Sequence, residues 1–129
     1  SIDNILRKKD LDVLNFIKID VEGLELDVLK GMAWTIERYN PYIYLEFNSW
    51  TLIAFQNINP RDFIQFLASE FEYLYKISKD STLHRLEGSA DWLSFLHENL
   101  VNNGCVDDLL LRKRGGVVSS SDFLTKILS

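Results

Sequence analysis

Charged side chains stand at alternate positions in an otherwise apolar stretch, residues 16–23, which reads FIKIDVEG. In an extended strand this spacing directs Lys18, Asp20 and Glu22 to one face and the apolar residues between them to the other. A strand inside a parallel sheet is usually apolar on both faces, so a line of charges along it needs a reason. Carboxylates in such a place can bind a cation or accept a proton. Asp20 and Glu22 are therefore the first candidates for chemistry.

A third acid lies near the end of a second apolar stretch. Residues 42–48 read YIYLEFN, and Glu46 in this stretch is followed closely by Trp50. In open parallel sheets, ligands bind beyond the carboxyl ends of the strands. We therefore expect Asp20 and Glu46 to flank one crevice, with Trp50 along its side. Gly23 would permit a tight backbone turn beside a ligand there.

Two of these charged residues also have plain structural interpretations. Glu22 could simply cap the helix that follows it, because helix N-termini favour negative charge. Lys18 would be costly to bury without a partner, so we expect it to form a structural ion pair with Asp20, Glu22 or Glu46.

Alternating strands and helices must position the candidate acids. Period-two alternation predicts strands at residues 13–20, 42–48, 71–78 and 105–113, and helical spacing predicts helices at residues 23–39, 59–70 and 91–103. Connections of helical length between strands indicate an α/β fold with a sheet and flanking helices.

The remaining segments are shorter or more polar. Residues 1–6 are expected to be a brief extended piece or turn, in which Ser1 or Asp3 could cap a short helix, and residues 79–90 a polar loop. The adjacent acids Asp107 and Asp108 would place a charge on each face of the last strand and so favour its exposed start. Residues 114–129 are expected to be a flexible joint and a short C-terminal helix.

Composition limits the class of protein. The 129 residues, 47% hydrophobic and 26% charged, are typical of one soluble globular domain. A net charge of −5 argues against a nucleic-acid partner, which requires a basic surface. No apolar stretch is long enough to span a membrane. The chain does not begin with methionine, which indicates either processing or a start partway through a longer protein.

No disulfide or metal centre is expected. Cys105 is the only cysteine, which indicates a small buried side chain in a reducing, cytoplasmic compartment. His84 falls in the polar loop and His97 on a surface helix, so we assign neither a catalytic role.

The stretch FIKIDVEGLELDVLKGM, followed by NPYIYLEFN, resembles the central signature of the FkbM-type methyltransferase family. In that family a strand ending K-x-D-x-E-G leads into a helix of the form E-x-x-V-L-x-G and then into a strand P-x-I-x-x-E. Residues 1–6, SIDNIL, resemble the piece T-L-D-x-L that precedes the signature. The likeness is specific over residues 16–48 and extends weakly to about residue 113.

The resemblance implies a Rossmann-like class I fold that binds S-adenosylmethionine and transfers its methyl group, usually to a hydroxyl oxygen of a sugar or other small molecule. It places Asp20, Glu22 and Gly23 against the methionine end of the cofactor, with Asp20 and Glu22 also as catalytic residues. Glu46 and Trp50 would then lie on the acceptor side. Carboxylates suit this site because they can hold an ammonium, stabilise a sulfonium and accept a hydroxyl proton.

The chain departs from the family pattern in one respect. It has no glycine-rich turn after a first strand and no second strand whose terminal acid could hold a ribose. We therefore interpret residues 1–113 as the C-terminal half of a methyltransferase domain, holding strands four to seven of the usual order 3-2-1-4-5-7-6. Without the N-terminal half, its missing partner, the fragment is expected to be inactive and to bind the cofactor weakly.

Two other functions remain open from the sequence. A truncated methyltransferase half could serve as a non-catalytic interaction or structural module. Alternatively, Asp20, Glu22 and Glu46 could be the oxygen ligands of a Mg²⁺-dependent hydrolase, although no nucleophile or phosphate loop accompanies them.

Overall fold

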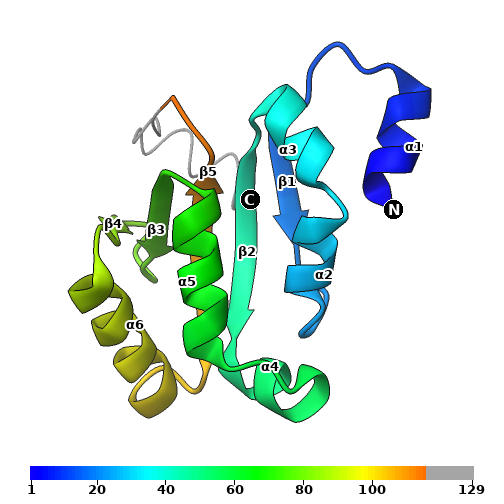
Figure 1. The fold of residues 1–129 in the computed structure, drawn as a ribbon. Coiled ribbons are helices and arrows are strands. Elements are labelled where there is room, and N and C mark those ends of the chain that lie inside the picture. The colour runs from blue at the N-terminus through cyan, green and yellow to red at the C-terminus, as the bar shows by residue number, and fades with distance from the viewer. Residues whose placement is uncertain (116–129) are drawn as a thin grey trace.

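The computed structural model describes residues 1–115 and shows an open sheet of five strands with six helices (Figure 1). The strands lie in the order β1-β2-β5-β3-β4. Their bounds are Phe16–Ile19 for β1, Tyr42–Asn48 for β2, Tyr73–Ile77 for β3, Leu83–Arg85 for β4 and Val106–Arg112 for β5. The helices are α1 (Ile2–Lys9), α2 (Glu25–Lys30), α3 (Ala33–Tyr39), α4 (Ser49–Gln56), α5 (Pro60–Glu70) and α6 (Ser89–Val101).

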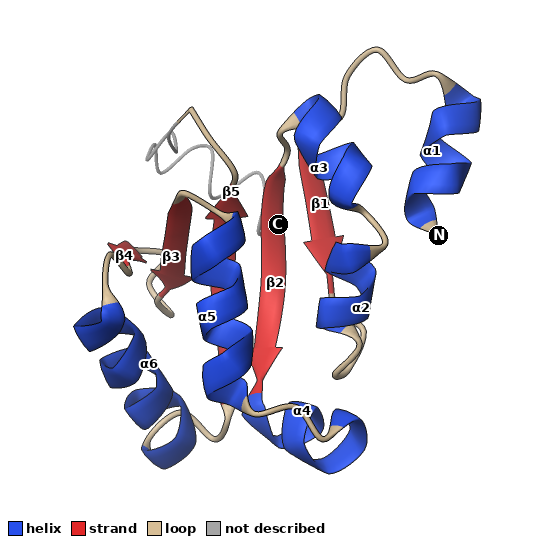
Figure 2. Ribbon diagram, in the orientation of Figure 1, coloured by secondary structure: helices blue, strands red, loops and turns tan. Residues whose placement is uncertain are grey.

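Strand direction brings several strand ends to one edge of the sheet. β1 and β2 are parallel, with Phe16 opposite Tyr42, whereas β5 is antiparallel to both β2 and β3. The carboxyl ends of β1, β2 and β3 and the amino end of β5 therefore meet at one edge, toward which the arrowheads of β1 and β2 point in Figure 2. The predicted pairing of the first two strands is confirmed, although β1 is shorter than residues 13–20. We call this edge the carboxyl edge.

The helix predicted over residues 23–39 is two helices, separated at Gly31 and Met32. Asp3 of α1 explains the break, because its carboxylate accepts hydrogen bonds from the backbone N–H groups of Trp34 and Thr35, at 3.0 and 2.9 Å. Those groups belong to the first turn of α3, so Asp3 acts as an N-terminal cap supplied from another helix. A distant residue thus starts a new helix inside a continuous helical pattern.

The other elements follow the sequence more closely. The helix at residues 59–70 is confirmed as α5, whose N-cap Asn59 accepts a hydrogen bond from the backbone of Arg61 at 2.9 Å. The extended piece or turn expected at residues 1–6 is wrong, because residues 2–6 belong to the helix α1; Ser1 caps this helix, which was one of the two caps expected. The sequence did not predict α4, and the expected loop at 79–90 contains the short strand β4. The predicted joint and helix at 114–129 lie, apart from their first two residues, outside the described residues.

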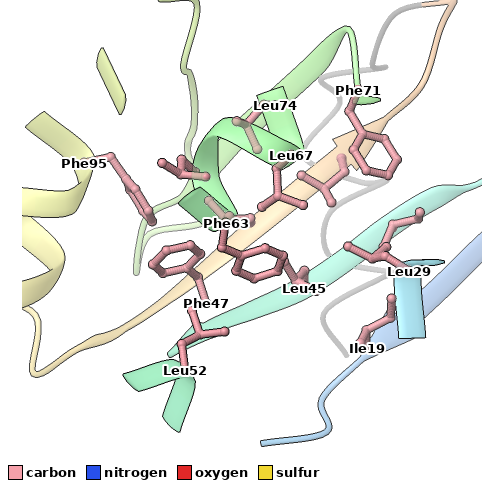
Figure 3. Packing of buried hydrophobic residues seen from close by; sticks show 14 of the residues in the cluster. Ile19, Leu29, Leu45, Phe47, Leu52, Phe63, Leu67, Phe71, Leu74 and Phe95 are labelled. Carbon is pink, nitrogen blue, oxygen red and sulfur yellow. The ribbon is translucent and has the colours of Figure 1, made fainter. Parts of the chain in front are cut away.

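The main core lies between the sheet and the helices α2, α3 and α5, which cover the same face (Figure 1). Phe47 is central to it, stacked on Phe63 with ring centroids 5.7 Å apart and edge-on to Phe95 at 5.1 Å (Figure 3). On the other face, Tyr42, Ile77 and Leu110 form a smaller buried cluster. The core fixes the register of β2 and β5, and so fixes which of their side chains reach the carboxyl edge.

The longest helix in residues 1–115, α6, has 13 residues, and none of the helices there is long and apolar enough to cross a membrane.

Candidate functional site

The turn from β1 into α2 is built from two successive residues in the left-handed region. Glu22 has φ 52° and Gly23 has φ 101°, so the chain reverses sharply after Asp20. A Cβ atom added to Gly23 would lie 3.1 Å from the carbonyl oxygen of Thr51, because the turn packs closely against α4. Glycine is therefore required at this position on two grounds, conformation and space.

Glu22 does not cap the following helix. The N-cap of α2 is Leu24, which has no side-chain capping bond, and among residues 1–115 the Glu22 carboxylate accepts no hydrogen bond. Asp20 and Glu22 are both exposed, so their carboxylates are accessible at the carboxyl edge. This leaves the capping interpretation of Glu22 without structural support.

Three carboxylates stand in line across neighbouring strands at the carboxyl edge. Glu46 on β2 lies opposite Asp108 on β5, and Ile19 lies opposite Leu45, so Asp20 comes level with Glu46 on the other side. Adjacent strands are about 4.8 Å apart, which makes these acids close neighbours. We call Asp20, Glu46 and Asp108 the carboxylate row.

The carboxylate row changes the protonation of Glu46. Partial burial raises the pKa of Glu46, and the negative charges of Asp20 and Asp108 raise it further, while a hydrogen bond with Asn48 acts in the opposite direction. A carboxyl group with a raised pKa is a stronger base once it is ionised. Glu46 is thus suited to take up a proton.

Tyr44 lies one pleat below Glu46 and supports the row. Burial raises the pKa of the Tyr44 phenol, as do its hydrogen bond to Asp108 and the charges of the three row carboxylates. The phenol therefore keeps its proton, donates to Asp108 and holds that carboxylate in place.

Lys18 does not form the expected ion pair. Its side chain is exposed, its ammonium lies 5.5 Å from the centroid of the Tyr44 ring, and within residues 1–115 no carboxylate lies within ion-pair distance of it. The expectation assumed a buried lysine. Because Lys18 is exposed on β1, it needs no compensating acid.

Glu25 is a buried acid whose importance the sequence reasoning missed. It is only 1% exposed in the first turn of α2, and its Oε1 atom receives no hydrogen bond from the described residues. Its charge also contributes to the raised pKa of Glu46. Glu25, Leu29, Met32 and Ile36 share the buried stripe of α2 and α3, and that helical spacing was a signal for a buried acid.

Trp50 lies on α4, the helix that follows β2 directly, and is 57% exposed. Its ring meets Phe55 edge-on, with centroids 5.2 Å apart, and Leu24 and Ile53 are exposed as well. α4 begins at Asn48, whose side chain accepts a hydrogen bond from the backbone of Thr51 at 3.1 Å. The last residue of β2 therefore starts the helix that carries Trp50.

Asp107 is buried, contrary to the expectation of an exposed strand start. Its carboxylate accepts from the side-chain amides of Asn99 at 2.9 Å and Asn103 at 3.1 Å, and Lys76 lies 3.8 Å away. Asn99 in turn accepts a hydrogen bond from the Ser49 hydroxyl. These bonds offset the cost of burying the charge and tie α4 and α6 to the start of β5.

The histidines lie away from the row, since His84 is exposed on β4 and His97 is exposed on α6. Cys105 is partly rather than fully buried. In residues 1–115 no three His, Cys, Asp or Glu side chains are grouped so that they could hold a metal ion. The arrangement therefore gives the Mg²⁺-dependent hydrolase no support.

Comparison with known families assigns the chain. The model of the methyltransferase FkbM domain matches residues 1–99, more than half of the 129 residues. The chain belongs to the FkbM methyltransferase family. No curated protein and no solved structure gives a significant match.

The FkbM match covers the turn at Glu22 and Gly23 and two members of the carboxylate row, Asp20 and Glu46. The third member, Asp108, follows the matched region. It reaches the row because β5 returns antiparallel between β2 and β3. The site therefore combines the matched FkbM region with a strand beyond it.

Proposed function

We propose that this chain carries the methyl-transfer site of an S-adenosylmethionine-dependent methyltransferase that acts on a hydroxyl oxygen of a sugar or other small molecule. The observation that supports it best is the carboxylate row beside the tight Gly23 turn, in a chain of the FkbM family.

The chemistry of the carboxyl edge suits this cofactor. S-adenosylmethionine carries two positive groups, an ammonium and a sulfonium, and the edge offers the exposed carboxylates of Asp20 and Glu22. In our proposal Asp20 and Glu22 would hold the methionine end, and the backbone at Gly23 would approach it closely.

The cofactor would supply a methyl group bonded to a positively charged sulfur. The acceptor oxygen would form its bond to the methyl carbon as the carbon–sulfur bond breaks, and the sulfur would keep the electron pair. Glu46 would take the hydroxyl proton, a role supported by its raised pKa and its place between two other acids. A positioned base contributes about a hundredfold or more to the rate. Trp50 would shield the acceptor side from water.

We propose further that β1, β2, β5 and β3 correspond to strands four, five, seven and six of a class I methyltransferase sheet, with residues 1–113 as its C-terminal part. Two observations support this: the parallel pair β1–β2, and β5 running antiparallel beside β2. In the described residues the outer edge of β1 is unpaired and borders an apolar hollow of about 330 Å³ lined by Leu6, Ile17 and Met32, among others. A further strand of the same domain would pair and pack there.

Methyl transfer by the full-length protein tests the proposal. The labelled methyl group of S-adenosylmethionine would be followed into a panel of hydroxyl-bearing sugars. Asp20→Asn and Glu22→Gln should each lower the rate about a hundredfold or more, with unchanged cooperative unfolding. Glu72→Gln is the matched control, because Glu72 is exposed just before β3 and remote from the row. Near-normal turnover in both site variants would contradict the assignment, and no transfer by the wild type would favour the non-catalytic module.

A further inference from the structure

A second hollow opens at the carboxyl edge, next to the carboxylate row. It has a volume of about 430 Å³ and lies between the end of β3, the end of α6 and the start of β5. Its polar lining includes Lys76, Lys79, Asn102, Asn103, Asp107 and Asp108. Ligand pockets commonly measure roughly 300–1,000 Å³, so this hollow can take a small molecule. We call it the β3–β5 pocket.

The charges of the β3–β5 pocket balance one another. Two lysines, Lys76 and Lys79, face two acids, Asp107 and Asp108. An anionic ligand would need a surplus of positive charge and a cationic ligand a surplus of negative charge, and the lining offers neither. An apolar ligand would need a largely apolar lining, whereas only Ile77 and Val106 are apolar here.

The lining suits hydroxyl groups, which both donate and accept hydrogen bonds. The Lys79 ammonium is a donor that has no ion-pair partner within residues 1–115, and Asn102 presents an amide whose nitrogen donates to Glu98 at 2.8 Å. Asp108 adds carboxylate acceptors. We propose that the β3–β5 pocket binds a neutral, hydroxyl-rich acceptor of about the size of a monosaccharide.

One wall of the pocket is already rigid. Asp107 is held by two asparagine amides and lies near Lys76, so its carboxylate and the Asn103 amide have fixed positions before any ligand binds. Polar groups held in this way bind with a smaller loss of conformational entropy.

Asp108 belongs to both the β3–β5 pocket and the carboxylate row. It lies opposite Glu46, so a hydroxyl bonded to Asp108 places a neighbouring hydroxyl within about one strand spacing of Glu46. This step rests on the proposed function, because it makes the pocket the acceptor side of the methyl-transfer site. Asp108 then positions the acceptor, and Glu46 takes the proton.

The binding test uses the full chain, labelled with ¹⁵N and titrated with methyl α-D-glucopyranoside while amide chemical shifts are recorded. Saturable shifts are expected at Lys79, Asn102 and Asp108. Cyclohexanol, an uncharged ring with one hydroxyl, and glucose 6-phosphate, an anion, should bind at least tenfold more weakly. The absence of pocket shifts with the glucoside, or equal binding of the other two probes, would overturn the proposal.

Variants connect the shifts to the lining. Lys79→Met and Asn102→Ala should each weaken glucoside binding roughly tenfold, the loss of one good hydrogen bond. Lys9→Met, at the exposed end of α1, should bind as the wild type does. Wild-type affinity in both pocket variants would exclude the pocket as the binding site.

The pocket and the proposed function can fail separately. Glucoside binding in the pocket without methyl transfer by the full-length protein would keep the pocket and overturn the proposed function. Methyl transfer to a sugar with an unchanged KM in Lys79→Met would keep the function and overturn the pocket.

Discussion

Replacing Glu46 by glutamine should make the fold more stable at neutral pH, although the change removes the proposed base. Glu46 lies opposite Asp108 and level with Asp20. Two carboxylates about 5 Å apart repel each other by about 0.8 kcal/mol at the dielectric constant of water. Directly opposed like charges in a ladder cost roughly 0.2–1 kcal/mol. With one neighbour on each side, Glu46→Gln should raise the free energy of unfolding by about 1 kcal/mol, or the melting temperature by about 4 °C.

The stability that Glu46→Gln gains over the wild type should depend on pH in a defined direction. The folded pKa of Glu46 is raised, so the folded state holds this proton more firmly than the unfolded state does. The contribution of Glu46 to the stability of the wild type is therefore present at low pH and is lost as the pH rises through the raised pKa. The advantage of Glu46→Gln should be full at pH 7 and should vanish below the ordinary glutamate pKa, where both side chains are neutral.

Urea unfolding followed by tryptophan fluorescence, at neutral and at acidic pH, measures both quantities. Glu72→Gln, an exposed control remote from the row, should leave stability unchanged at either pH. The argument that the carboxylates of the row repel one another would be refuted by a Glu46→Gln variant that is no more stable than the wild type at neutral pH. It would also be refuted if the variant kept the same stability advantage at acidic pH.

Three further substitutions test other parts of the structure. Asp3→Ala should lower the free energy of unfolding by about 2 kcal/mol, because Asp3 accepts three hydrogen bonds from the start of α3. Urea unfolding at pH 7 measures this, and an unchanged urea midpoint would contradict it. Gly23→Ala should lower the free energy of unfolding by about 1–3 kcal/mol, because the φ of Gly23 is positive and Thr51 lies close. Gly88→Ala should lower it by less, because there is open space around Gly88. Equal losses in the two variants would argue against strain at Gly23. Glu25→Met should stabilise the chain by about 1–2 kcal/mol, because it removes a buried oxygen that has no hydrogen-bond partner among residues 1–115. A less stable variant would show that the oxygen is satisfied.

The sequence was sufficient for the features that depend on local spacing. Alternation over residues 13–20 and 42–48 predicted two parallel strands, of which the first is observed over Phe16–Ile19, and the acids at their ends reached one edge because parallel strands share a direction. The helix predicted at residues 59–70 is α5, with Asn59 as its N-cap and Pro60 as its first residue. The tight turn expected at Gly23 is present, although the close approach of Thr51, which also requires glycine there, could not be seen in the sequence.

Features that depend on distant contacts could not be predicted in this way. Asp108 joins the carboxylate row only because β5 lies between β2 and β3, which no local pattern states. The break between α2 and α3 depends on Asp3, 31 residues before Trp34. Asp107 is a more local case, since Asn99 and Asn103 precede it by only eight and four residues, but their amides reach its carboxylate only because the chain turns between α6 and β5. Glu25 differs, because its place in the apolar stripe was visible in the sequence.

Calorimetric titration of the full-length protein with S-adenosylmethionine and with S-adenosylhomocysteine tests the central claim most directly. The two ligands differ by the methyl group and by the positive charge on sulfur. If Asp20 faces the sulfonium, the wild type should bind both ligands, and Asp20→Asn should weaken S-adenosylmethionine roughly tenfold more than S-adenosylhomocysteine. Equal loss for both ligands, or no binding of either by the wild type, would contradict the claim that the carboxyl edge of this sheet is a methyl-transfer site.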